Sequence, residues 1–183
     1  MARVPLLADR SQLSPEAQRI YDQIGVRRGG VPGPFQVLLH APELAGRVGL
    51  VGQYLRFEGA LPAPVREAAI LAAARETSCD YEWSQHEPLA RAAGVPDRTI
   101  RIIAGRGGLE GLTPAERLPI AFAREAFRRH RVPADLFAAA QAEWGTPGVV
   151  ELVTTIGYYG MLALLLNTAE VEPAPGTPRL PLP

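Results

Sequence analysis

The apolar residues of this chain recur with the spacing of a helix, and this pattern restricts the fold more than any other feature. Alanine-rich segments with a period of about 3.6 residues dominate, and no stretch alternates between apolar and polar residues with the composition of a strand. Alanine is also the strongest helix former, so local propensity agrees with the pattern. The sequence therefore predicts an all-α fold.

Helix-start and helix-stop signals place the individual helices. A proline follows Ser14, and Thr113-Pro114-Ala115-Glu116 has the form of a capping box, so each marks a helix start. Gly94 marks a helix end, because glycine suits the left-handed position after a helix. These signals predict helices over residues 15–25, 42–58, 63–76, 78–93, 97–104, 114–129, 133–144 and 146–167.

The charge balance and the cysteine count exclude several classes of function. The 19 basic and 19 acidic residues cancel, which argues against a protein that binds nucleic acid or an anionic membrane. All the basic residues are arginine, so lysine Schiff-base chemistry, pyridoxal phosphate enzymes and a phosphate-loop lysine are excluded. Cys79 is the only cysteine, so an internal disulfide, a CxxC redox pair and a multi-cysteine zinc site are excluded as well.

The location of the protein is predicted from the same features. A lone thiol and an N-terminal segment without a long apolar region favour a cytoplasmic protein. The most apolar stretch, Val149–Leu166, is near the lower length limit for a membrane span. It contains Glu151 and two glycines and lacks a flanking cluster of positive charge, so we interpret it as a buried core or interface helix.

One predicted helix carries several side chains that can do chemistry. At 100° per residue, Cys79, Glu82, Trp83 and His86 share one face of the helix over residues 78–93. Residues three or four apart can touch, so Glu82 is within reach of both the thiol and the imidazole. Cys79 and His86 are about 10 Å apart along the helix axis, so a proton path between them would run through Glu82 or a water molecule.

A further carboxylate belongs to the preceding predicted helix. Glu67 lies in the apolar stripe of residues 63–76, where a carboxylate is either paired or has a raised pKa because burial disfavours its charged form. The turn around Thr77 is short, so we expect the two helices to be antiparallel neighbours. Glu67 would then face the surface that carries Cys79 and His86.

Each of these residues also has a structural interpretation. A buried cysteine can be a small hydrophobe, a single histidine on an apolar face can be a satisfied core residue, and Trp83 can simply fill the core. For Cys79, the start of a helix favours a thiolate, whereas the charges of Asp80 and Glu82 oppose it, and the sequence leaves the balance open. The joint placement of the four polar groups on one surface favours a functional site.

These residues and their spacing resemble a known family. Arg66-Glu67, the segment Cys79-Asp80-Tyr81-Glu82-Trp83 and His86 are similar to the carboxymuconolactone decarboxylase and alkyl hydroperoxidase D-like family, as is the segment over residues 151–163. The likeness covers roughly residues 35–168. We therefore divide the chain into an N-terminal arm and helix (1–34), a carboxymuconolactone decarboxylase-like helical domain (35–168) and a proline-rich tail (169–183), expected to be extended and either loose or draped over a neighbour.

The resemblance implies an all-α helical bundle that assembles into homotrimers or hexamers. In the hydroperoxidase members a Glu, a CxxC pair and a His form a proton relay and a redox centre. By position, Glu67 matches that Glu, Cys79 the first Cys and His86 the His, while Glu82 stands in place of the second Cys. Without a partner thiol an intramolecular disulfide cycle cannot run, and the Tyr-Glu-Trp-x-x-His form is closer to the decarboxylase-like branch.

Three functions follow as hypotheses. The first is a cofactor-free lyase that acts on a lactone or keto acid, with catalytic His86, Glu67 and Glu82 and with Arg66 and Trp83 binding the substrate. The second is a one-cysteine peroxidase, a peroxiredoxin-type antioxidant activity in which Cys79 is oxidised to sulfenic acid. The third is a helical oligomer that binds a small ligand without catalysis.

The partners that we expect are a small-molecule substrate and further copies of the chain, without nucleic acid, membrane or cofactor. A metal site is not predicted, because a lone histidine with two carboxylates is a thin ligand set.

Overall fold

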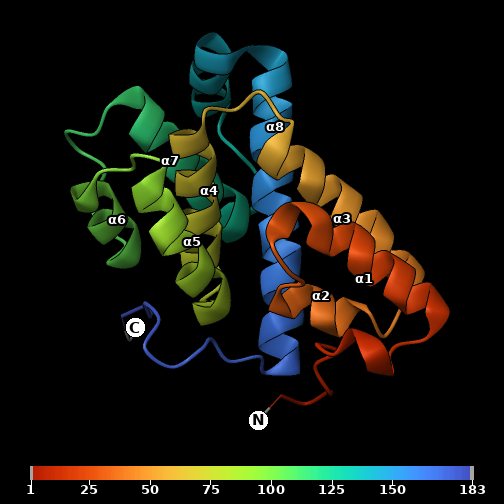
Figure 1. Ribbon diagram of the computed structural model, residues 1–183. Helices are drawn as coiled ribbons and strands as arrows, with labels where there is room; N and C mark the ends of the chain where they lie inside the picture. Colours follow the sequence, from red (N-terminus) through yellow and green to blue (C-terminus); the bar gives the residue numbers. More distant parts are fainter. Residues whose placement is uncertain (1, 182–183) are drawn as a thin grey trace. The chain divides into compact units, whose positions relative to one another are not determined.

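The computed structural model describes residues 2–181. Met1, at the start of the predicted arm, and Leu182 and Pro183, at the end of the predicted tail, lie outside the described residues. Within the described part all regular secondary structure is helical, which confirms the predicted all-α fold (Figure 1). The elements are η1 (Arg10–Gln12), α1 (Pro15–Arg28), α2 (Gly33–Leu38), α3 (Pro42–Phe57), α4 (Ala63–Glu76), α5 (Asp80–Ala92), α6 (Asp97–Ala104), α7 (Pro114–Arg129) and α8 (Ala134–Ala169).

The chain forms two compact units. Unit 1 consists of residues 1–59 and 165–172, and unit 2 consists of residues 60–164 and 173–183. The predicted division into residues 1–34, 35–168 and 169–183 is based on the family resemblance, whereas these units are defined by contacts within the chain. The division therefore stays a prediction.

In unit 1, α1 and α3 lie side by side (Figure 1). Ser14 caps α1 as predicted, because its side chain accepts a hydrogen bond from the Ala17 N–H. The helix continues to Arg28, beyond the predicted end at residue 25, and stops where Gly29 takes a left-handed φ of 70°. A Cβ atom on Gly46 of α3 would lie 2.9 Å from Cδ1 of Ile20 in α1, so Ile20 packs closely over this glycine.

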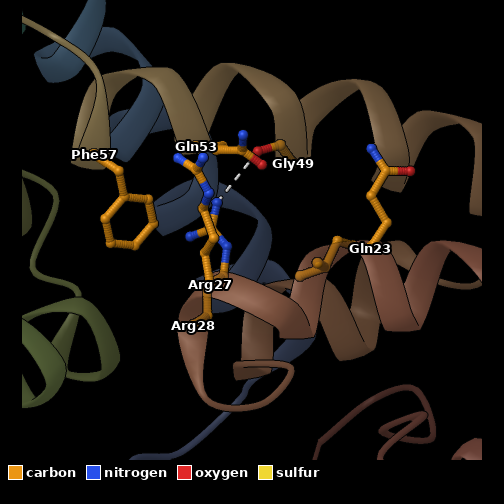
Figure 2. A pocket seen from close by; sticks show the side chains of 7 residues that line it. Gln23, Arg27, Arg28, Gly49, Gln53 and Phe57 are labelled. Atoms are coloured by element: carbon orange, nitrogen blue, oxygen red, sulfur yellow. Dashed lines mark hydrogen bonds between the residues drawn. The ribbon is translucent and has the colours of Figure 1, made fainter.

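A small hollow lies between α1 and α3. Figure 2 shows Arg28 beside α3, where its Nη2 donates a hydrogen bond of 3.2 Å to the Gly49 carbonyl. The hollow has a volume of about 10 Å³, which is room for about one water molecule. It is therefore too small for an organic ligand.

In unit 2, α4 is the central helix. It packs against α5, α6 and α7, and nearly all of its residues are buried. Five alanines between residues 68 and 74 let the neighbouring helices approach closely. The core around them is formed by larger side chains, including Leu71, Ile103, Phe122 and Leu152. The start of α7 is held by the predicted capping box, since both reciprocal hydrogen bonds between Thr113 and Glu116 are present.

The start of α5 corrects one expectation. The helix begins at Asp80 and not at residue 78, so Cys79 is the N-cap residue and does not lie in the first turn. Ser78 has a left-handed φ of 50°, and the Cys79 N–H donates back to the Ala74 carbonyl at 2.8 Å. The chain reverses direction within this short turn, and the reversal delays the first helical residue of α5.

The long helix α8 consists of two segments joined at a break. Gly145 has φ 67° and ψ 175°, which is not helical, and Pro147 follows it. The break lies between the two helices predicted over residues 133–144 and 146–167. By length and composition, α8 is the one helix among residues 2–181 that could cross a membrane, and 56% of its most apolar window is buried inside the protein. A buried core helix meets the same criteria, and the cytoplasmic location stays a prediction.

The described part of the C-terminal tail contains no helix, but a turn over residues 174–177 interrupts the expected extended chain, and the tail lies on unit 2 from residue 173 onward. The Leu180 N–H donates to Asp80 Oδ1 at 2.9 Å, and Arg75 Nη1 donates to the Pro181 carbonyl at 3.3 Å. The Leu180 side chain contacts the unit 2 core. These contacts attach the tail to the beginning of α5.

Candidate functional site

A histidine and a glutamate from adjacent helices form the centre of the site. His86 Nδ1 lies 2.8 Å from Glu67 Oε2, a hydrogen-bond distance. Glu67 is in the middle of α4 and His86 in the middle of α5, and the two helices pack against each other. The expected proximity of the two residues is therefore found in the structure.

A second carboxylate faces the other ring nitrogen. His86 Nε2 lies 3.7 Å from Glu82 Oε2, one helical turn away on α5. The side chains of His86, Glu67 and Glu82 are only 4%, 6% and 4% exposed. Both nitrogens of a buried imidazole thus face a carboxylate.

This arrangement suits proton transfer. With Glu67 ionised, the Nδ1–H of His86 donates to it, and Nε2 is then the atom that gives or takes a proton. Low exposure keeps bulk water from competing for that proton. In residues 2–181 no group of three or more His, Cys, Asp and Glu side chains has the arrangement of a metal site.

Arg66 lies beside the same carboxylate. Its Nε is 3.6 Å from Glu67 Oε1, and its side chain is 16% exposed. Its buried Nε makes no hydrogen bond within the described part of the chain, which leaves a donor for an anion.

Cys79 is fully buried at the N-cap of α5. The pKa of its thiol is raised from 9.0 to about 12, mainly because the thiol is buried. The charges of Glu82 and Asp80 also raise this pKa, whereas hydrogen bonds from the backbone N–H groups of Glu82 and Tyr81 lower it. The sequence left open whether Cys79 is a thiol or a thiolate, and this raised pKa favours the neutral thiol at pH 7.

Trp83 lies in the hydrophobic core of unit 2 and is 3% exposed. The same core cluster includes Val65 and Leu71 of α4. This position favours the packing interpretation, while its predicted contact with substrate stays a prediction.

Sequence reasoning missed the role of Tyr159. The rings of Tyr159 and His86 form a T-shaped contact, with their centroids 4.8 Å apart and their planes at 82°. Tyr159 makes a similar T-shaped contact with Tyr158. It comes from α8, far along the sequence from α5, so no helical spacing could have paired it with the histidine. Its place in the family-like segment over residues 151–163 was the available signal.

Glu151 was also missed, and it supports the site from a distance. Its Oε2 accepts hydrogen bonds from the backbone N–H groups of Ala60 and Leu61, at 2.8 and 3.1 Å. These residues come just before α4, so the carboxylate holds the segment that leads into the helix carrying Glu67.

Comparisons with known proteins agree with this description. Residues 42–125 match the model of the carboxymuconolactone decarboxylase family. The fold is similar to that of an uncharacterised peroxidase-related protein with an alkylhydroperoxidase AhpD core from Ralstonia eutropha JMP134, with a TM-score of 0.77 and 20% identity over 95% of this chain and 93% of that one. No curated protein matches the chain.

Two further solved structures share the fold. A peroxidase-related protein from Silicibacter sp. TM1040 has a TM-score of 0.76 and 16% identity, over 95% of this chain and 92% of that one. A variant of the debrominase Bmp8 in complex with 2,3,4-tribromopyrrole has a TM-score of 0.75 and 15% identity, over 96% and 95%. The family match and the shared helical fold lead to one conclusion: residues 42–125 match the carboxymuconolactone decarboxylase family, and the chain has the helical fold of AhpD-like proteins.

Proposed function

We propose that this protein is a cofactor-free lyase that releases CO₂ from a small lactone or keto acid, with His86 as the proton donor. The observation that carries the proposal is the buried hydrogen bond of 2.8 Å between His86 Nδ1 and Glu67 Oε2, with Glu82 on the opposite ring nitrogen. A histidine held between two carboxylates is equipped to accept, store and return a proton.

The proton balance of the reaction assigns each group a role. When the bond between carbon and the carboxylate breaks, CO₂ leaves and the bonding electrons pass to the adjacent carbonyl, which becomes an enolate. The Nε2–H of His86 then protonates the carbon, and a proton from solvent replaces it by way of Glu82. One proton is consumed for each CO₂ released. Glu67 keeps the ring oriented and stabilises the imidazolium.

Arg66 supplies the positive charge that such a substrate requires. Its guanidinium lies next to Glu67, is mostly buried and has an unfilled donor at Nε. A guanidinium binds carboxylate and enolate oxygens well, because its donors are fixed in one plane. We assign Arg66 to holding the anionic substrate beside His86.

The thiol peroxidase alternative has weaker support. The pKa of Cys79 is raised to about 12, so its nucleophilic thiolate form is scarce at pH 7. The chain also lacks a second cysteine to resolve a sulfenic acid. The ligand-binding alternative needs only an apolar pocket without charged groups. This site instead holds the charged side chains of Arg66, Glu67 and Glu82, which are mostly buried.

We further propose that the protein works as a homo-oligomer in the cytoplasm. Val150, Val153, Met161 and Leu164 of α8 are 45–69% exposed and lie within about 80° of one another around the helix. An exposed apolar stripe of this kind marks an interface, and a second copy of the chain is the partner we assign to it. The family resemblance favours a trimer or hexamer.

The test is a substrate screen among small lactone and keto acids, with CO₂ release as the readout and deuterium incorporation in D₂O as the record of protonation. We expect His86→Ala to lower the turnover of an accepted substrate by about 10²- to 10⁴-fold, the usual contribution of a general acid. His130→Asn is the matched control, since His130 lies outside the site at the left-handed C-cap of α7, which Asn tolerates. Unchanged CO₂ release by the His86→Ala protein would refute the proposal.

The same preparation tests the thiol alternative. An organic hydroperoxide is added in a molar series, and Cys79 oxidation is followed by intact mass with and without a dithiol. Oxidation no faster than that of free cysteine agrees with the lyase proposal, and fast oxidation that a dithiol reverses would favour a peroxidase.

A further inference from the structure

A second cavity lies in unit 2, where three helices begin. It has a volume of about 360 Å³ and is formed by the first turns of α4, α6 and α7 and by the chain that leads into α6. This volume is within the usual range of about 300–1,000 Å³ for small-molecule sites. Its walls are mainly apolar and include Pro64, Val65, Ala68, Val95, Pro96 and Ala115.

The cavity is separate from the His86 site. Val65 and Ala68 line it from α4, whereas Glu67 is rotated from them by about 200° and 100° around the same helix. Neither His86 nor Cys79 is among the residues that line it. A ligand bound here would not meet the proton-transfer groups.

The carboxylate at the cavity wall is already satisfied. Glu116 Oε1 accepts from the Thr99 hydroxyl at 2.7 Å, and Oε2 accepts from the Thr113 N–H at 2.9 Å and from its hydroxyl at 2.7 Å. The hydrogen bond from Thr99, followed by those from Thr113, lowers the pKa of Glu116 to about 2 against the opposing effect of burial. Glu116 thus holds the helix starts together and leaves little capacity for accepting from a ligand.

Arg98 is the group that remains available. It lines the cavity from α6, and its side chain is 55% exposed, which places it at the rim. Nη2 donates to the Gly111 carbonyl at 3.1 Å and lies 3.5 Å from Glu116 Oε2. No hydrogen bond from Nε or Nη1 to any residue in 2–181 is present, so two donors of a cation face solvent beside an apolar hollow.

We propose that this cavity binds a small apolar carboxylic acid, with the hydrocarbon body between α4, α6 and α7 and the carboxylate on Arg98. The apolar walls favour the body over water, and the guanidinium favours an anionic head at the rim.

Titration calorimetry with sodium octanoate tests the site, with 1-octanol as the uncharged probe of equal chain length. We expect octanoate to bind more tightly than octanol. Arg98→Gln should weaken octanoate binding about tenfold, as expected for a lost charge-assisted hydrogen bond, and leave octanol unchanged. Ala115→Phe should weaken both probes, because its ring fills the cavity.

Two controls locate the binding. Arg101→Gln removes an arginine from the same helix that is exposed and does not line the cavity, so it should have no effect. Glu67→Gln should also leave octanoate binding intact. Circular dichroism and thermal melting confirm that each variant is folded. The proposal is overturned if octanoate does not bind at millimolar concentration, or if it binds the Arg98→Gln protein as tightly as the unchanged protein. Loss of octanoate binding in Glu67→Gln would also overturn it, because the ligand would then be located at the His86 site.

Discussion

Glu67 Oε2 and His86 Nδ1 lie 2.8 Å apart although the residues are 19 positions apart in the chain, and the pair is buried. Each residue satisfies the other in a region from which water is largely excluded. Removing one partner leaves a buried hydrogen-bonding group unsatisfied, which typically costs about 1–3 kcal/mol.

The first prediction follows from this pair. Glu67→Ala is expected to lower the free energy of unfolding by about 1–3 kcal/mol, because it leaves the buried imidazole without this hydrogen-bond partner. The double variant Glu67→Leu/His86→Leu is expected to recover only part of this loss, since both members of the pair are removed but the buried Glu82 then lacks the imidazole. Urea unfolding at pH 7 measures the stability of both variants. A free energy of unfolding for Glu67→Ala within about 0.5 kcal/mol of that of the unchanged protein is the level of a surface substitution and would contradict the assigned pairing.

The second prediction concerns the Cys79 thiol and high pH. The folded state holds this proton more tightly than the unfolded state does, because the pKa is raised from 9.0 to about 12. The resulting stabilisation is fully present below pH 9 and is lost as the pH rises toward 12. Thermal unfolding between pH 8 and 11 should therefore show a steeper loss of stability for the unchanged protein than for Cys79→Ala. Parallel curves would show that burial does not raise the pKa of the thiol.

The third prediction concerns Thr99 and low pH. Thr99→Val preserves the shape of the side chain but removes the hydroxyl that donates to Glu116, and it should lower the free energy of unfolding by about 1–3 kcal/mol at pH 7. The pKa of Glu116 is depressed from 4.5 to about 2, so its stabilising contribution is present above pH 4.5 and is lost as the pH falls toward 2. The difference in the free energy of unfolding between the Thr99→Val and unchanged proteins should therefore become smaller as the pH falls from 4.5 to 2. A difference that does not change with pH would show that it does not come from the hydrogen bond to the ionised Glu116.

The fourth prediction concerns the tail. Asp80 accepts from the Leu180 N–H, and Arg179 lies 3.5 Å from its other oxygen, so Asp80→Ala should release the tail. Limited proteolysis with mass detection is expected to cleave the tail faster in this variant. Asp97→Ala is the matched control, because Asp97 is likewise the first residue of a helix but makes no contact with the tail in the described residues. Equal cleavage in both variants would mean that Asp80 does not hold the tail.

The fifth prediction tests self-association. Leu164→Glu places a charge in the exposed stripe of α8 and should reduce the oligomer mass in light scattering coupled to size exclusion. Val26→Glu is the control, since Val26 is 82% exposed on α1 and outside the stripe. An oligomer that persists in Leu164→Glu, or a monomer in the unchanged protein, would argue against this interface.

Much of the local structure could be predicted because its causes are local. The boundaries of α4 and α6 match the expected residues, and the capping box of α7 is present, since caps, prolines and helical spacing act within a few residues. The start of α5 was placed two residues early, because the left-handed turn at Ser78 depends on the reversal between two packed helices.

The sequence by itself determined the helical character of the chain and the shared face of Glu82 and His86, because both follow from the period of a single helix. Tertiary structure alone decided that Glu67 bonds to Nδ1, that Tyr159 meets the imidazole and that the Cys79 thiol stays protonated. Distances between helices and the exclusion of water depend on how several elements pack together, and no spacing along one helix encodes them.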